Sequence, residues 1–416
     1  MTDPPPVARP RLPPIAPRSA YLHIPFCHRR CFYCDFAVVP LGDRADGADG
    51  PGAASIAAYL EQLSREIRLA PAGPPLATVY LGGGTPSMLT PAQVGALLTL
   101  LRQRYGLMPG GEITLEMDPA SFDQARLEGY LQVGINRVSL GGQSFSDAVL
   151  EGLGRRHRAD ALRQAAGWLQ QALGRGGLTS WSLDLLQALP GQDLPQWDAQ
   201  LQEAIALAPP HLSIYDLIVE PGTVFAWRQQ RGELHLPDED TGAELMWHTQ
   251  RRLSRAGYGH YEVSNYALPG HACRHNRVYW SGAGWWGFGM GATAAPDGVR
   301  RARPRTREAY AAWLEQLEAR GGSPQDDGEP MAWEDRWLVG LRRREGVNAA
   351  ALLAEAGLPS EALADLQTQL APFVARGVLR LEGPRWRLSD PEGLALSNAV
   401  LRELLRWWEH RGPADR

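Results

Sequence analysis

Three cysteines close together near the N-terminus are the residues best suited to carry chemistry. Cys27, Cys31 and Cys34 follow the spacing C-x-x-x-C-x-x-C, and the fourth cysteine of the chain, Cys273, is distant in sequence. Thiolates on one short loop can each bind a different iron of a [4Fe–4S] cubane, which leaves the fourth iron open to a small molecule. Three unrelated buried thiols are the alternative, but three of four cysteines within eight residues argue against it. The spacing therefore predicts a [4Fe–4S] cluster on these three residues.

Composition narrows the class of protein without indicating a reaction. A chain of 416 residues suggests two or three domains, or one large barrel with appendages. The clustered cysteines are not a disulfide framework, so the expected setting is a reducing cytoplasm. The formal net charge of −4 gives no indication of a nucleic-acid partner, and no stretch is long and apolar enough to span a bilayer. Residues 1–19 are rich in proline and lack the apolar segment of a secretory signal, which predicts a disordered leader.

Strand-like and helical patterns alternate from Ala20 onward and must position the cysteine loop. The expected strands are Ala20–Phe26, Thr78–Gly82, Glu112–Met117, Arg137–Leu140, Ser180–Leu186 and His211–Val219. The expected helices between them are Ile56–Leu69, Pro91–Tyr105, Ser121–Val133, Asp160–Leu173 and Leu194–Leu207. Such alternation predicts a parallel sheet with helices outside it. Six units are too few for a closed eight-stranded barrel, so the predicted fold is α/β, a partial (β/α)6 barrel over residues 20–265.

The pattern changes after the predicted barrel. Residues 266–330 contain a Trp- and Gly-rich stretch, His271–Gly291, and a polar linker, Gly321–Pro330. Residues 331–416 predict a winged-helix-like α+β module, because short helices precede a small hairpin. The expected helices are Trp333–Arg343, Asn348–Ala356 and Ser360–Arg376, and the hairpin strands are Val378–Glu382 and Arg385–Leu388.

Such a module could bind DNA through a basic run, Arg342, Arg343 and Arg344. Three arginines are a weak electrostatic footprint, and a solvated helix face on a packing domain explains them better. We therefore expect no nucleic-acid partner.

Polar residues and glycines fall where four of the expected strands end. These segments are Gly82–Pro86, Glu116–Pro119, Gly142–Phe145 and Asp184. In parallel βα barrels the ligand site is built at the C-terminal ends of the strands. Successive glycines also let backbone groups approach a ligand closely. Each segment alone could be a turn or a cap, but together they predict a ligand site at this rim.

Taken in order, these motifs resemble the radical S-adenosylmethionine (SAM) family of oxygen-independent coproporphyrinogen III oxidases, in which SAM fills the open iron of the cluster. The resemblance covers about residues 20–290 and implies a radical-SAM barrel. The matching segments are Tyr21-x-His23-Ile-Pro-Phe-Cys27, Gly82-Gly-Gly-Thr-Pro86, Glu116-x-Asp118-Pro119, Gly142-Gln143-Ser-Phe145, Gly154-Arg155-x-His157 and Asp184-Leu-x-x-x-Leu-Pro190.

The resemblance also implies a set of SAM-binding residues. Arg155 suits the carboxylate of SAM, and carboxylates suit its ribose hydroxyls or its ammonium group. Tyr33 lies between two cluster ligands, where an aromatic ring could stack on adenine. The implied residues are Tyr21, Gly83, Glu116, Gln143, Arg155 and Asp184, with Tyr33, Gly84 and Thr85 beside them.

Two branches of this family differ in two motifs, and both motifs can be compared with this sequence. The oxidases resemble C-x-x-x-C-x-x-C-x-C, but Phe36 stands at the position of the last cysteine, so weak or absent coproporphyrinogen oxidation is expected. The HemW-type haem chaperone branch carries H-N-x-x-Y-W, present here as residues 275–280. The resemblance therefore implies a haem chaperone that binds haem, a [4Fe–4S] cluster and SAM. The oxidase is the alternative, and a radical-SAM enzyme that modifies nucleic acids is a third, disfavoured hypothesis.

The H-N-x-x-Y-W residues His275, Asn276, Tyr279 and Trp280 are the candidate haem contacts. Imidazole is a good donor to haem iron, and aromatic rings can lie against a porphyrin face. A histidine beside aromatic residues can also be an ordinary core residue, and that alternative stays open. Cys273 is a second candidate ligand, but its spacing from the histidine is not that of C-x-x-C-H haem attachment, which favours a buried structural cysteine.

The partner implied by the resemblance is a haem-acceptor protein. The sequence does not identify it, and a membrane-associated acceptor is compatible with a chain that has no transmembrane segment of its own.

Overall fold

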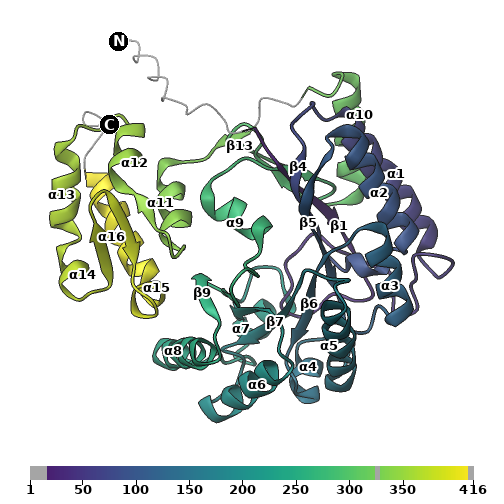
Figure 1. Ribbon diagram of the computed structural model, residues 1–416, viewed down its shortest axis with the longest axis horizontal. Coiled ribbons are helices and arrows are strands. Elements are labelled where there is room, and N and C mark those ends of the chain that lie inside the picture. Colours follow the sequence, from purple (N-terminus) through teal and green to yellow (C-terminus); the bar gives the residue numbers. More distant parts are fainter. Residues whose placement is uncertain (1–15, 324–327, 411–416) are drawn as a thin grey trace.

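The computed structural model describes residues 16–323 and 328–410. Most of the predicted leader and part of the predicted linker lie outside these residues. Six parallel strands form the centre of a nine-stranded sheet and follow one another in sequence order across it (Figure 1). They are β1 (Ser19–Ile24), β4 (Leu76–Gly83), β5 (Leu107–Met117), β6 (Arg137–Gln143), β7 (Ser180–Gln187) and β8 (His211–Asp216). The predicted partial (β/α)6 barrel is confirmed. The last strand ends earlier than predicted.

Three short strands extend the two edges of this sheet. β11 (Trp286–Phe288) pairs in parallel with β1. At the other edge, β10 (Asn265–Ala267) pairs antiparallel with β8, and β9 (Gly259–Glu262) pairs antiparallel with β10. Antiparallel strands at one edge need no further crossover helices. This is how the sheet ends after six βα units.

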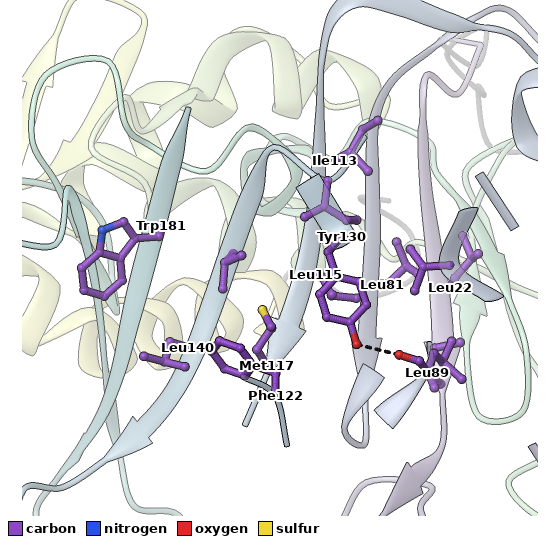
Figure 2. Close-up of a cluster of buried hydrophobic side chains, with 14 of the residues drawn as sticks. Leu22, Leu81, Leu89, Ile113, Leu115, Met117, Phe122, Tyr130, Leu140 and Trp181 are labelled. Carbon is purple, nitrogen blue, oxygen red and sulfur yellow. Dashed lines mark hydrogen bonds between the residues drawn. The ribbon is translucent and has the colours of Figure 1, made fainter. Parts of the chain in front are cut away.

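The predicted helices pack along the outside of the sheet and bury its outward-facing side chains (Figure 1). They are α1 (Ala53–Leu69), α2 (Pro91–Arg104), α3 (Gln124–Val133), α5 (Ala159–Gly174) and α6 (Leu194–Ala206). Figure 2 shows the resulting core, in which Leu22, Leu81 and Leu115 come from three neighbouring strands. The hydroxyl of Tyr130, on α3, donates to the carbonyl of Leu89 at 2.6 Å. A buried tyrosine that reaches a backbone acceptor in this way adds apolar contact without an unpaired hydroxyl.

The Trp- and Gly-rich stretch contains a helix that the sequence analysis did not predict. This helix, α9 (Arg274–Ser281), contacts β4 on one side and the C-terminal module on the other (Figure 1). Its N-terminus is held by Glu112 of β5, whose carboxylate accepts from the backbone N–H groups of Arg274 at 3.1 Å and His275 at 2.9 Å. A carboxylate there satisfies donors that the helix itself cannot. The segment thus packs against the sheet rather than lying beyond the barrel.

The C-terminal module is winged-helix-like, as predicted, and has a hydrophobic cluster of its own. Three strands pair in the order β15-β17-β16. One predicted helix, Ser360–Arg376, is two helices, because a proline has no N–H to continue the ladder at position 372. The elements are α11 (Trp333–Leu341), β15 (Val347–Asn348), α12 (Ala349–Glu355), α13 (Glu361–Gln369), α14 (Ala371–Ala375), β16 (Leu379–Glu382), β17 (Arg385–Leu388), α15 (Glu392–Ala395) and α16 (Ser397–His410).

The basic run of this module lies at its junction with the barrel. Val263 donates its N–H to the carbonyl of Arg342, and Arg344 donates to that of Tyr261, each at 3.1 Å. Burial lowers the pKa values of Arg342 and Arg343. Two of the three arginines are therefore half-buried between two parts of the protein, which makes the run a poor surface for nucleic acid.

Candidate functional site

A cavity of about 350 Å³ opens at the C-terminal ends of the strands. The three cysteines of the predicted cluster line it, together with eight of the nine predicted SAM residues. The eight are Tyr33, Gly83, Gly84, Thr85, Glu116, Gln143, Arg155 and Asp184. The ninth, Tyr21, is not among the lining residues, but its ring is stacked at 6.1 Å on that of Tyr80, which does line the cavity. The predicted residues from separate strands are thus brought to one place.

The cysteine loop is held by short backbone contacts. Cys34 donates its N–H to the carbonyl of Cys31 at 3.2 Å, and Leu41 donates to that of Cys27 at 2.8 Å. Two sulfur atoms also have donors, because the Thr85 hydroxyl lies 3.5 Å from Cys27 Sγ and Arg155 Nη1 lies 3.6 Å from Cys31 Sγ. Burial raises the pKa of Cys27 to about 12, and a bound metal would favour the thiolate over this bound proton.

The donor set fits a cluster better than a single ion. All three thiols are free of disulfides and partly accessible from the cavity. Within residues 16–323 and 328–410, no group of three or more His, Cys, Asp or Glu side chains is arranged to hold one metal ion. A cubane makes a different demand, because each thiolate meets a different iron. Separated thiols with hydrogen-bond donors near their sulfur atoms suit that demand.

The packing of the chain itself requires the two glycines Gly83 and Gly84, where β4 ends. Gly83 has φ +112°, and a Cβ there would lie 2.5 Å from the His23 ring. A Cβ on Gly84 would lie 2.6 Å from the carbonyl oxygen of Phe26. The sequence analysis explained these glycines by close approach to a ligand. The structure adds a second reason, which is the close packing of this turn against the segment that leads into the cysteine loop.

Glu116 has a partly buried carboxyl whose pKa lies above the usual range of a glutamate. It ends β5 within the cavity, where the Tyr80 hydroxyl donates to Oε1 at 2.8 Å and the Gly83 N–H donates to Oε2 at 3.0 Å. Burial raises its pKa to about 7, although both hydrogen bonds favour the carboxylate. Its charge therefore changes near neutral pH.

Arg155 forms a buried ion pair with Asp118. Its Nη2 donates to Asp118 Oδ2 at 2.7 Å and to the carbonyl of Gly141 at 2.8 Å. Burial alone would raise the pKa of Asp118, but the guanidinium and His157 outweigh it and hold this pKa well below its usual range. Arg155 was expected to bind the carboxylate of SAM. Its Nη2 is already paired with Asp118 and its Nη1 lies next to Cys31 Sγ, so SAM would have to share the guanidinium with these groups.

Gln143 and Asp184 present polar groups from the next two strands. Gln143 has φ +62°, a left-handed conformation that costs energy in a residue with a side chain and that marks the end of β6. Asp184 accepts from the hydroxyls of Ser139 and Ser182, each at 2.8 Å. Burial raises the pKa of Asp184. Serine hydroxyls thus hold this carboxyl in place at the wall of the cavity.

The candidate haem histidine is buried and fully hydrogen-bonded. His275 is 0% exposed, its Nδ1 lies 2.7 Å from Thr78 Oγ1 and its Nε2 lies 2.9 Å from the Tyr279 hydroxyl. Burial lowers its pKa to about 3, so the ring is neutral. Neither nitrogen is free for iron in this arrangement. A haem iron bound to His275 would have to replace one of these two hydrogen bonds and reach a side chain that is completely buried.

The other residues of this segment lie around it. Tyr279 is edge-on to both His275 and Trp285, at 5.2 and 5.0 Å between ring centroids. Cys273 is buried and its Sγ lies 3.5 Å from Glu112, as expected of a structural cysteine. Asn276, Tyr279 and Trp280 are partly exposed. The structure therefore makes these three, and not His275, the accessible members of the predicted haem set.

Several lining residues were not among the predicted site residues. Tyr80 and Ser139 each lie two residues before another polar or glycine position on the same strand, and alternate residues of a strand share one face. That alternation is the signal that could have found them. Nothing in the sequence placed Phe36 and Tyr215 at the same cavity, which they line from opposite ends of the βα series.

Comparison with known proteins agrees with this geometry. Residues 21–194 match the model of the radical SAM superfamily. The haem chaperone HemW of Synechocystis sp. is 39% identical over 94% of this chain and 97% of that protein. HemW of Escherichia coli is 33% identical over 94% of this chain and 98% of that protein. The chain belongs to the HemW family of the radical SAM superfamily.

Membership of the radical SAM superfamily implies a [4Fe–4S] cluster and SAM, which the donor set and the cavity fit. A mouse relative, radical S-adenosyl methionine domain-containing protein 1, mitochondrial, is 34% identical over 96% of this chain. Among solved structures, coproporphyrinogen III oxidase (HemN) of E. coli aligns over 94% of this chain and 91% of its own with a TM-score of 0.75. At 22% identity, that likeness concerns the fold alone. Within the described part of this HemW-family chain, no helix is long and apolar enough to cross a membrane.

Proposed function

We propose that this chain is a haem chaperone that binds haem and passes it to an acceptor protein. The observation that carries the proposal is the identity of 39% with a haem chaperone HemW along almost the whole of both chains. The H-N-x-x-Y-W residues of this branch and Phe36, in place of a further cysteine, support the same assignment.

The proposal includes a [4Fe–4S] cluster on Cys27, Cys31 and Cys34, with SAM beside it. Such a cluster supplies an open iron to which the amino and carboxylate groups of SAM can bind. The chain supplies the surroundings: Thr85 and Arg155 place donors next to two of the sulfur atoms. Glu116 and Asp184 add carboxyl groups for the polar and cationic parts of SAM.

The test is a haem titration of anaerobically reconstituted protein, followed by an assay with coproporphyrinogen, SAM and a reductant. We expect one haem per chain and negligible conversion of coproporphyrinogen. Robust conversion to protoporphyrinogen would assign the chain to the oxidases, and absence of haem binding would refute the chaperone.

A further inference from the structure

Large apolar side chains are exposed around the mouth of the cavity. Among the described residues seven such side chains are exposed, and five of them come from two segments near the C-terminal ends of the strands. Ile218 is 65% exposed, Phe36 is 56% exposed and Trp227 is 54% exposed. Contiguous exposed apolar residues on a folded protein mark a binding surface. We define the mouth rim as Phe36, Tyr215, Ile218, Val224 and Trp227.

Contacts with the cysteine loop place these residues together. Phe36 and Tyr215 line the same cavity as the three cysteines. Val224 and Trp227 lie on α7 (Val224–Gln230), which is fastened to the cysteine loop through Phe225. The N–H of Phe225 donates to the carbonyl of Phe32 at 3.0 Å, and its ring lies 6.5 Å from those of Phe32 and Tyr33.

The residues of the mouth rim are exposed, although the residues beneath them are well packed. Leu217 and Phe225 are buried in a separate hydrophobic cluster below it, with Phe32 and Tyr33 packed against them. Their sequence neighbours Ile218 and Val224 point away from that cluster into solvent. The segment therefore contains more apolar residues than its hydrophobic cluster buries, and the other apolar side chains are exposed to solvent. Such rigid apolar contacts bind at little cost in conformational entropy.

Arginines flank this apolar surface. Arg30 lines the cavity, and its guanidinium has one weak contact, at 3.4 Å, with the carbonyl of Val38. The guanidinium of Arg228, one helix position from Trp227, lies 4.8 Å above the Phe32 ring. Neither side chain is in an ion pair within the part of the chain that the structure describes. Guanidinium groups recognise carboxylates with good geometry.

We propose that the mouth rim is the haem-binding surface: the macrocycle lies against Phe36, Ile218 and Trp227, and its propionates are met by Arg30 and Arg228. The inference rests on the proposed function and names the site that it would use. A flat apolar ring with two carboxylates matches an apolar surface with cations beside it. The cavity itself holds the cluster ligands and the SAM residues, so the macrocycle lies across its mouth. Haem can reach this exposed surface without any movement of α9, whereas it could reach the buried His275 only if α9 moved.

Haem titrations of variants test this surface, with the Soret band as readout. Ile218→Ser combined with Trp227→Ser should weaken haem binding by about tenfold or more, because central aromatic and aliphatic contacts dominate binding energy. Met108→Ser is the matched control: it removes another exposed apolar side chain at the start of β5, roughly 30 Å along that strand from the cavity. We expect it to bind haem like wild type. Iron content should be unchanged in all three proteins.

A second arm tests the arginines. Arg30→Gln with Arg228→Gln should weaken the binding of haem but leave that of iron protoporphyrin dimethyl ester unchanged, because the ester has no carboxylates. Wild-type affinity in the rim variant, or loss of binding in Trp280→Ser alone, would overturn the mouth rim as the haem site. Failure of wild type to bind haem at all would instead refute the proposed function, so the two failures are distinguishable.

Discussion

The three cysteines of the loop are expected to act as one unit, and Cys273 is expected to be separate from it. Replacement of Cys27, Cys31 and Cys34 by alanine removes the protein ligands of the cluster, so reconstituted protein should fall from about four irons per chain to background. Cys273→Ala is the matched control, since this thiol is buried against Glu112 away from the cavity. Iron and sulfide analysis, together with the thiolate-to-iron absorption band, measures the effect. Equal iron in the triple variant would refute the assignment.

The pKa of Glu116 predicts a pH-dependent affinity for SAM. This carboxyl loses its proton as the pH rises through about 7. The positive groups of SAM favour the ionised form, so the affinity should rise from pH 6 to pH 8, by at most about tenfold per pH unit, and then level off. Glu116→Gln keeps partners for Tyr80 and Gly83 but carries no charge.

Equilibrium binding of SAM to reconstituted protein measures this dependence. The amino group of SAM also titrates, so the informative quantity is the difference in pH dependence between wild type and Glu116→Gln. If wild type and Glu116→Gln show the same pH dependence across this range, the charge of Glu116 does not affect the binding of SAM.

At the scale of residues, the sequence predicted which side chains gather but not how they pair. Because ligand sites lie at the C-terminal ends of parallel strands, Glu116, Gln143 and Asp184 were expected at one site, and they line one cavity. It could not indicate that Arg155 is paired with Asp118, since both positions are compatible with a ligand contact. The sequence also could not predict that both ring nitrogens of His275 are hydrogen-bonded, because Thr78 is remote in sequence.

At the scale of elements, α9 connects the H-N-x-x-Y-W segment to the candidate SAM site. The ring of His275 is stacked on that of Tyr80 at 5.1 Å, and the Tyr80 hydroxyl donates to Glu116. A change in the position of α9 therefore reaches the cavity through two side chains. This contact path gives the H-N-x-x-Y-W residues a structural role that does not require them to bind haem.

Removing the carboxylate that holds α9 should loosen this helix. Glu112→Ala leaves the N–H groups of Arg274 and His275 without their acceptor, which should cost about 1–3 kcal/mol of unfolding free energy. Faster amide hydrogen exchange confined to residues 274–281 is the expected signature. Glu151→Ala, which removes a largely exposed carboxylate from another helix, is the control. Unchanged exchange in α9 would show that the Glu112 contacts do not hold it.

The elements that the sequence analysis missed share a cause. All six parallel strands were predicted, since each is an apolar run followed by a helical pattern. The sequence analysis did not predict α9, because this helix has only eight residues and lies among tryptophans and glycines, where helical periodicity is barely visible. The strands β9 and β10 are shorter still, and their pairing with β8 depends on tertiary contacts. Short segments of this kind take their structure from what they pack against.

At the scale of the whole molecule, the barrel and the C-terminal module have separate hydrophobic clusters joined by mainly polar contacts. The backbone contacts of residues 342 and 344 with the barrel edge are accompanied by two partly exposed ion pairs, Arg277–Glu345 and Arg300–Asp335. In addition, Nδ1 of the largely buried His260 on β9 lies 2.8 Å from Asp390 Oδ1. Partly exposed ion pairs of this kind contribute little to stability. Cooperativity between the two parts should accordingly be weak.

A cavity in the core of the module should therefore leave the cluster site intact. Trp386 is completely buried in the cluster of the module, and Trp386→Ala should cost about 3–5 kcal/mol there. Calorimetry should show a module transition that moves to lower temperature, while the transition of the barrel and its iron content stay at wild-type values. Leu140→Ala, in the core of the barrel, should do the reverse. If Trp386→Ala abolishes iron binding, the two parts fold as one unit and the polar junction carries more free energy than its contacts indicate.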